Sequence, residues 1–154
     1  MQINLDDEPQ EAFDCSGLAR TQSTSFQRVS LRQWVSSGQW RAIQAGLHGE
    51  EAAWFVEKTH EYADRIAAMP VTYGQQGPSA IAYLHYFHSG SDWYITEKDT
   101  EQDQWQAFGY AVLNGDTQNA ELGYIPIIEL VRLGVELDLH FTPTPLSKIR
   151  RGDL

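Results

Sequence analysis

The stretch that decides the fold class is residues 80–96, whose sequence is AIAYLHYFHSGSDWYIT. Residues 81–88 carry apolar and aromatic side chains at odd and even positions alike, which predicts a strand with both faces at least partly covered. Residues 89–92, Ser-Gly-Ser-Asp, have the composition of a turn. Residues 93–96 then resume a strand pattern, so the whole stretch predicts an antiparallel hairpin.

Three further strands are predicted after the hairpin. The first, residues 105–113, ends at Asn114-Gly115, a dipeptide typical of tight turns. The second is residues 121–125. The third, residues 135–141, alternates Val, Leu, Leu and Phe with Glu, Asp and His, which is typical of a strand with one solvent-facing side.

The longest predicted helix spans residues 50–69. Its apolar residues recur at spacings of three and four, and Pro70 ends the pattern. Shorter helices are predicted at residues 31–35, 40–45 and 127–133. Gly38 interrupts the helical pattern between the first two of these helices, and Pro126 suits the start of the third.

Together these elements predict an α+β fold, in which an antiparallel sheet of about five strands has a long N-terminal helix and short helices packed on it. The folded domain would occupy residues 26–146. Residues 1–25 are predicted to be a disordered acidic tail, because they hold few large apolar side chains. Residues 147–154 are predicted to be a short basic tail.

The composition limits the class of protein. The chain has 154 residues and one cysteine, Cys15, so no internal disulfide can form and a reducing compartment is indicated. The N-terminus is acidic and lacks the apolar core of a signal peptide, and no apolar run is long enough to span a bilayer. We therefore expect a cytoplasmic protein.

No sequence motif identifies an enzyme. Phosphate-binding loops and the serine elbow of hydrolases are both absent from the sequence. His85 and His88 lie three residues apart on a predicted strand and point to opposite faces, so one ion would not easily bind both, although His140 could join one of them in space. We predict no metal site and no cofactor, and no catalytic residue can be named.

Charge is distributed unevenly along the chain. The net charge is −10, and residues 92–138 carry ten acidic and two basic side chains, a local net charge of −8. Residues 15–47 contain four arginines and no acidic residue. An acidic field of this kind can attract a basic protein, although an acidic surface that only keeps the chain in solution is an alternative. The overall charge argues against direct nucleic-acid binding.

Five segments carry a family resemblance: DWYITEKD at 92–99, QAFG at 106–109, AELGYI at 120–125, EL at 129–130 and ELDLHFTP at 136–143. Through them, residues 82–146 resemble a family of small bacterial proteins known only as a domain of unknown function, whose members occur on plasmids, integrative elements and phages. The resemblance implies a mobile-element accessory protein and transfers no catalytic residue. Gly109 and Gly123 are expected to permit close strand packing or a bulge.

The leading hypothesis is a mobile-element accessory protein, not an enzyme, that binds a basic protein partner through an acidic face. Such a face could imitate nucleic acid and inhibit a host defence complex of the anti-restriction or anti-CRISPR type. The predicted protein-binding residues are the carboxylates Glu97, Asp99, Glu101, Asp103 and Glu121.

The alternative hypothesis is a small enzyme with a carboxylate and histidine site. Glu97, Asp99 and Glu121 would converge with His85 or His140 at one end of the sheet, and the site could use a divalent metal ion. Convergence in a pocket would favour the enzyme, whereas a dispersed, convex acidic face would favour protein binding.

Overall fold

The structure is a computed structural model that describes residues 31–71, 77, 79–99 and 105–152. The elements, in chain order, are α2 (Ser37–Gly46), α3 (Ala52–Ala68), β1 (Ile81–Ala82), β2 (Leu84–His88), β3 (Ser91–Asp99), β4 (Gln106–Val112), β5 (Glu121–Ile125), α4 (Ile127–Arg132), β6 (Glu136–Leu137), β7 (Thr144–Pro145) and α5 (Leu146–Ile149). Residues 31–33 are also helical. The predicted acidic tail, residues 1–25, lies outside the described residues.

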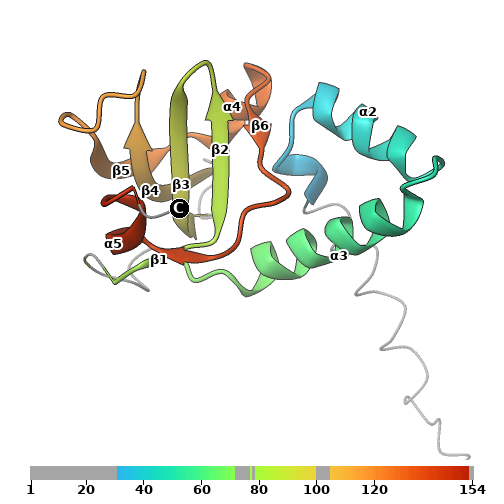
Figure 1. Cartoon of the computed structure of the whole chain (residues 1–154), viewed down its shortest axis with the longest axis horizontal. Coiled ribbons are helices and arrows are strands. Elements are labelled where there is room, and N and C mark those ends of the chain that lie inside the picture. The colour runs from blue at the N-terminus through green and yellow to red at the C-terminus, as the bar shows by residue number, and fades with distance from the viewer. Residues whose placement is uncertain (1–30, 72–76, 78, 100–104, 153–154) are drawn as a thin grey trace, which may run out of the picture.

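Five strands form one antiparallel sheet in the order β5-β4-β3-β2-β6 (Figure 1). The β2–β3 hairpin turns at Ser89 and Gly90, whose φ angles of 49° and 77° suit a two-residue turn. Asn114 and Gly115, with φ angles of 53° and 72°, make the turn that ends β4. The α+β class and the five-stranded antiparallel sheet predicted from the sequence are confirmed.

The predicted first strand, residues 81–88, is divided in two. β1 pairs with β7 in a separate two-stranded sheet, whereas β2 pairs with β3 and β6. The division falls at Tyr83, whose backbone N–H donates to the carbonyl oxygen of Ile95 at 2.7 Å. The sequence does not show this break, because both pieces carry the same apolar pattern.

The C-terminal segment is more ordered than the sequence predicts. The sequence predicts a basic tail from residue 147, whereas α5 runs to Ile149 directly after β7. Leu146 and Ile149 are buried and pack beside Phe141 on one face of the sheet. These two apolar side chains hold the segment in place, so only the residues after α5 remain as a basic end.

The last predicted strand, residues 135–141, forms only the two residues of β6. The chain turns at Asp138, whose carboxylate accepts the backbone N–H of His140 at 2.9 Å. The hydroxyl of Tyr62 donates to the carbonyl oxygens of Asp138 and Phe141 at 2.6 and 3.1 Å. These bonds satisfy backbone groups that a longer strand would have paired with the sheet.

α2 begins earlier in the chain than predicted, and α3 begins later. α2 begins at Ser37 because the hydroxyl of Ser36 accepts the N–H of Gln39 at 3.1 Å and caps the helix. Gly38 therefore lies inside α2, where the sequence predicts an interruption. α3 falls within the predicted span 50–69, and the ammonium group of Lys98 donates to two carbonyl oxygens of its last turn at 2.8 and 2.7 Å.

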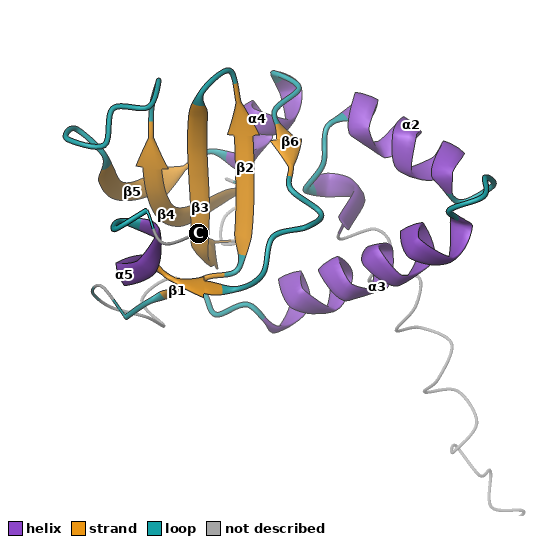
Figure 2. Cartoon of the chain, viewed as in Figure 1, coloured by secondary structure: helices purple, strands orange, loops and turns teal. Residues whose placement is uncertain are grey.

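Both faces of the sheet contribute to a core. α2 and α3 lie on the β6 side of the sheet, and α5 lies near β4 and β5 (Figure 2). On one face the sheet residues Leu84, Tyr86 and Ile95 pack with Ile43, Tyr62, Ile66 and Ile127 from the helices. On the other face the core consists of Ala80, Ala82, Tyr94, Tyr110, Val112, Phe141, Leu146 and Ile149. No helix within the described ranges is long and apolar enough to cross a membrane.

Candidate functional site

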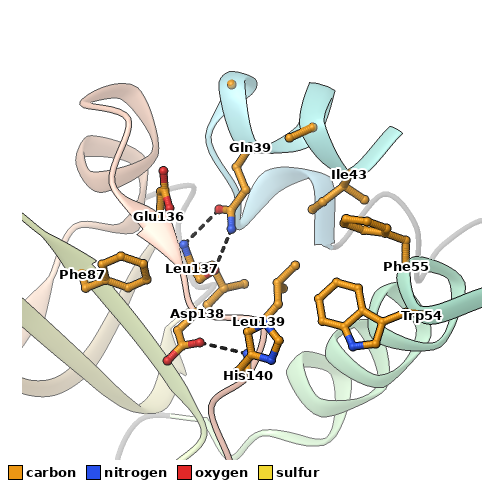
Figure 3. A pocket seen from close by; sticks show the side chains of 12 residues that line it. Gln39, Ile43, Trp54, Phe55, Phe87, Glu136, Leu137, Asp138, Leu139 and His140 are labelled. Carbon is orange, nitrogen blue, oxygen red and sulfur yellow. Dashed lines mark hydrogen bonds between the residues drawn. The ribbon is translucent and has the colours of Figure 1, made fainter. Parts of the chain in front are cut away.

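A groove lies between the two helices α2 and α3 and the chain that continues from β6 (Figure 3). Its volume is about 370 Å³. The lining residues are Gly38, Gln39, Ala42, Ile43, Trp54, Phe55, Phe87 and residues 136–140. These segments are far apart in the sequence, so the groove exists only because the helical layer packs against the β6 edge of the sheet.

Gln39 fixes this edge. Its side-chain Nε2 donates to the carbonyl oxygen of Leu137 at 2.6 Å, and its Oε1 accepts the N–H of Leu137 at 2.9 Å (Figure 3). One primary amide therefore satisfies both backbone groups of the edge residue, as a neighbouring strand would. The Ser36 cap that starts α2 at Ser37 also sets the position of Gln39 in the first turn.

Trp54 and Phe55 form an aromatic wall of the groove. Their rings meet edge to face with centroids 4.8 Å apart, and the ring of His140 lies 5.1 Å from that of Trp54. Gly46 permits this arrangement, because a Cβ at that position would lie 2.2 Å from the ring of Phe55. The wall therefore depends on a glycine at the end of α2.

Acidic side chains occur on the side of the groove that β6 provides. Glu136 is exposed, and Figure 3 shows it near Phe87 and across the groove from Trp54 and Phe55. Asp138 is half-buried beside it. The groove thus combines aromatic surface with carboxylates, a combination that suits a cationic group carried on an apolar stem.

A second cluster lies close to the groove and shares Asp138 with it. The Nδ1 atom of His85 lies 3.1 Å from Oδ2 of Asp138, and its Nε2 atom lies 2.8 Å from Oδ1 of Asp92. The register explains the second contact: His85 pairs with Tyr94 across β2 and β3, so Asp92 is the diagonal neighbour on the same face. The imidazole ring stacks on Tyr94 with centroids 4.6 Å apart and planes 7° apart.

This arrangement restricts what His85 can do chemically. Carboxylate oxygens accept hydrogen bonds, so both contacts are N–H···O bonds only when the ring carries two protons. Both nitrogens are then occupied, which leaves neither directed at a substrate.

Burial, followed by the negative charges of Asp92 and Asp138, raises the pKa of the Tyr94 phenol to about 12.

The three predicted protein-binding carboxylates that the structure describes, Glu97, Asp99 and Glu121, do not form one face. Glu97 is buried with 2 % exposure, because a β-bulge between Ile95 and Glu97 shifts the alternation of side chains in β3. Glu97 therefore does not lie at the surface, where a protein-binding face would need it. Asp99 accepts a hydrogen bond from Gln106 at 2.9 Å near the end of β3. Glu121 is exposed on β5, at the opposite edge of the sheet from the groove. Glu101 and Asp103 lie outside the described residues.

The carboxylates of the predicted enzyme site also remain separate. Glu121 lies on β5 and His85 on β2, with two strands between them in the sheet. The ring of His140 packs against Trp54, and the described contacts of His140 include neither Glu97 nor Asp99. Sequence reasoning missed Asp92 and Asp138 as partners of His85. The alternation of residues 135–141 predicts that Asp138 lies on the polar face of its strand, but it does not indicate that this strand pairs with β2.

Within the part of the chain that the structure describes, no group of three or more His, Cys, Asp or Glu side chains could hold a metal ion. The chain matches no family model, no curated protein and no solved structure at a significant level.

Proposed function

We propose that this chain is a protein-binding module that takes a basic, partly apolar segment of a partner protein into the groove between α2, α3 and β6. The observation that carries the proposal is the pairing of an aromatic wall, Trp54 and Phe55, with the exposed carboxylate of Glu136. A groove of this volume is at the small end of ligand pockets and suits roughly one or two large side chains.

Charge favours a basic occupant over an acidic or neutral one. The chain has a net charge of −10. Glu50 and Glu51 are exposed just before α3, within a few residues of Trp54. A Lys or Arg side chain would place its apolar stem on Trp54 and its charge near Glu136, gaining apolar and ionic contacts together. The acidic field would also speed encounter with such a partner.

The His85 cluster supports binding over acid–base catalysis. A general base needs a nitrogen that can face the substrate. In this structure both nitrogens of His85 face carboxylates, at 2.8 and 3.1 Å. We therefore assign the cluster a positioning role: it holds Asp138, and with it the turn that leads from β6 to His140 along the groove.

We also propose a class of partner. The resemblance of residues 82–146 to mobile-element proteins favours a nucleic-acid-binding host complex, whose basic surface would complement an acidic chain. The occupant of the groove would then be a Lys- or Arg-bearing segment of that complex. Inhibition of restriction or CRISPR activity by the purified chain is the assay that tests this extension.

The binding proposal is tested with defined probes. Synthetic peptides with Lys or Arg next to Leu, Phe or Trp are titrated into isotopically labelled protein, with Glu or Gln replacing the basic residue in control peptides. We expect shifts of the Trp54 indole and Gln39 amide resonances with the basic peptides only. Affinity should fall as salt rises, because the charges lie at the rim of the groove.

Two pairs of variants localise the binding. Ala42→Trp fills the groove, whereas Ala45→Trp on the same helix lies outside its lining. Glu136→Lys reverses the rim charge, whereas Glu129→Lys alters an exposed carboxylate on α4. We expect a loss of about tenfold or more in affinity for the first member of each pair and little change for the second. Equal effects within both pairs, or peptide shifts indifferent to salt, would contradict the proposal.

A further inference from the structure

We infer that His85 is a proton sensor that sets the charge of the groove, so that the groove binds a cationic side chain more tightly when His85 is neutral. This regulation acts on the site of the proposed function, on which its effect on binding rests. Asp138 makes the connection, because it lines the groove and also contacts the ring of His85.

The imidazole ring of His85 lies between two carboxylates. Its Nε2 atom is 2.8 Å from Oδ1 of Asp92, and its Nδ1 atom is 3.1 Å from Oδ2 of Asp138. A ring with two protons donates to both carboxylates, whereas a neutral ring donates to one and turns a lone pair towards the other. Loss of one proton therefore replaces a hydrogen bond by a repulsive contact.

Aromatic neighbours hold the ring of His85 in this orientation. The ring stacks on Tyr94 with centroids 4.6 Å apart and planes 7° apart, and the rings of Phe87 and Phe141 lie 5.8 and 5.5 Å away. Packing on several sides opposes rotation of the ring towards other partners. Both nitrogens keep facing their carboxylates in either protonation state, so a carboxylate must take up the change.

Asp138 is the carboxylate that loses its hydrogen bond. The contact of His85 with Asp92 is the shorter of the two, so the neutral ring keeps its proton on Nε2 and Nδ1 loses its own. The other oxygen of Asp138 accepts the backbone N–H of His140 at 2.9 Å (Figure 3). The ring of His140 packs on Trp54 in the wall of the groove, with centroids 5.1 Å apart. One carboxylate thus links the protonation of His85 to the groove.

The other charged and titratable groups around the ring keep their state between about pH 5 and 8, the range in which histidine titrates. On β3 and β4, the stacked rings of Tyr94 and Tyr110 are phenols, which stay protonated in this range. On α3, the hydroxyl of Tyr62 donates to the carbonyl oxygen of Asp138, and burial raises the pKa of this phenol to about 12. Arg65, which donates to the carbonyl oxygen of Phe141, stays charged.

The charge of the cluster therefore changes by one unit when His85 titrates. An imidazolium between two carboxylates gives a net charge of −1, and the neutral ring leaves −2. A cationic occupant of the groove gains from the added negative charge on Asp138. At the effective dielectric constants of a protein surface, one charge several ångströms away changes affinity by about three- to tenfold.

The coupling is tested first in the free, full-length chain. An NMR titration of the histidine rings between pH 5 and 8 follows His85, while the amide of His140 and the indole of Trp54 report on the groove. We expect both reporters to shift with the midpoint of His85. In His140→Gln, which removes the other histidine of the groove, the Trp54 indole should still follow His85.

Two variants of the cluster separate proton sensing from packing. Asp92→Asn removes a negative charge that faces the ring, so the midpoints of His85 and of both reporters should move together to lower pH. His85→Gln should abolish the titration of the His140 amide, and circular dichroism checks that this variant is folded. His88→Gln is the matched control, because His88 is an exposed histidine on the same strand.

The second measurement is the affinity, at each pH, for one synthetic peptide that carries Arg next to Leu and Phe. From pH 5 to pH 8 we expect a rise of about three- to tenfold in the wild-type chain and in His88→Gln, and no rise in His85→Gln. Binding that is independent of pH in the wild-type chain overturns the inference and leaves the proposed function standing.

A peptide that binds at no pH contradicts the proposed function, and the free chain then still tests the sensor. A ring of His85 that keeps one protonation state from pH 5 to 8 overturns the inference. Reporters that stay fixed while His85 titrates, or that titrate unchanged in folded His85→Gln, overturn it as well.

Discussion

The side-chain amide of Gln39 hydrogen-bonds both the N–H and the carbonyl oxygen of Leu137, 98 residues later in the sequence. Gln39 lies in the first turn of α2, and Leu137 is the last residue of the edge strand β6. The pair joins the helical layer to the sheet and forms one end of the groove. It also closes an edge that would otherwise present backbone groups to a further strand.

Replacement of Gln39 by Ala should therefore destabilise the fold. Two hydrogen bonds to half-buried backbone groups are lost, at a cost of about 1–3 kcal/mol in the free energy of unfolding. Gln44→Ala is the matched control, because Gln44 is exposed on the same helix and should change stability by less than about 0.5 kcal/mol. Urea denaturation measures both, and equal destabilisation would show that the Leu137 contact contributes nothing.

Gly109→Ala should be far more damaging than Gly123→Ala, although the two glycines face each other across β4 and β5. A Cβ at Gly109 would lie 2.2 Å from the carbonyl oxygen of Tyr94, next to the bulge in β3, and the backbone cannot yield cheaply there. We expect a loss of about 3 kcal/mol or more, or failure to fold.

At Gly123 no atom lies within 4 Å of the added Cβ, so the structure gives no packing reason for this glycine. The change should be within about 0.5 kcal/mol of neutral. Thermal unfolding compares the stabilities of the two variants. A tolerated Gly109→Ala would contradict the close approach of β3 and β4 at the bulge.

His85→Ala should leave the carboxylates of Asp92 and Asp138 without the ring that separates them. Both acids would then lose their contact with the ring, and Tyr94 would lose its stacking partner, at a cost of about 2 kcal/mol. His88 lies on the same strand, is exposed, and its replacement by Ala should cost less than about 0.5 kcal/mol. If the two variants unfold at the same denaturant concentration, the cluster has no structural role.

The Tyr94 phenol predicts a loss of stability at alkaline pH. Its pKa is about 12 in the folded chain, above the ordinary value of 10.0, mainly because the ring is buried. The folded state therefore holds the phenolic proton more tightly than the unfolded state does. The stability that this contributes is fully present below pH 10 and is lost as pH rises from 10 towards 12.

Tyr94→Phe isolates this effect, because Phe keeps the aromatic ring that stacks on His85 and removes only the titrating hydroxyl. Between pH 10 and 12 the free energy of unfolding should fall less steeply in the variant than in the wild-type chain. Chemical denaturation at a series of pH values gives the two slopes, and the ultraviolet absorbance of tyrosinate reports the ionisation itself. Parallel slopes would mean that Tyr94 does not contribute.

Local chemistry accounts for the elements that the sequence predicted well. The Ser89-Gly90 and Asn114-Gly115 turns need positive φ angles, which these residues adopt readily, so the hairpin and the end of β4 could be located. β5 matches its predicted bounds, residues 121–125. Each of these features is specified by neighbours within a few residues.

The candidate site could not be predicted in the same way. His85 meets Asp92, seven residues away, through the hairpin register, and meets Asp138, 53 residues away, through the pairing of β2 with β6. The burial of Glu97 depends on a bulge that the alternation of residues does not show. The described acidic residues between 92 and 138 are close in sequence, but those on the strands extend from β5 at one edge of the sheet to β6 at the other.

By itself, the sequence determined the α+β class, the turns and the acidic character of the chain, because periodicity, turn residues and charge are local or additive properties. Only the tertiary structure decided which acids are buried, where the aromatic groove lies, and that an amide in α2 would close the β6 edge. Those features need segments up to 98 residues apart to pack together. Such contacts are selected by the fit of whole surfaces in the folded chain, and no short stretch of sequence encodes that fit.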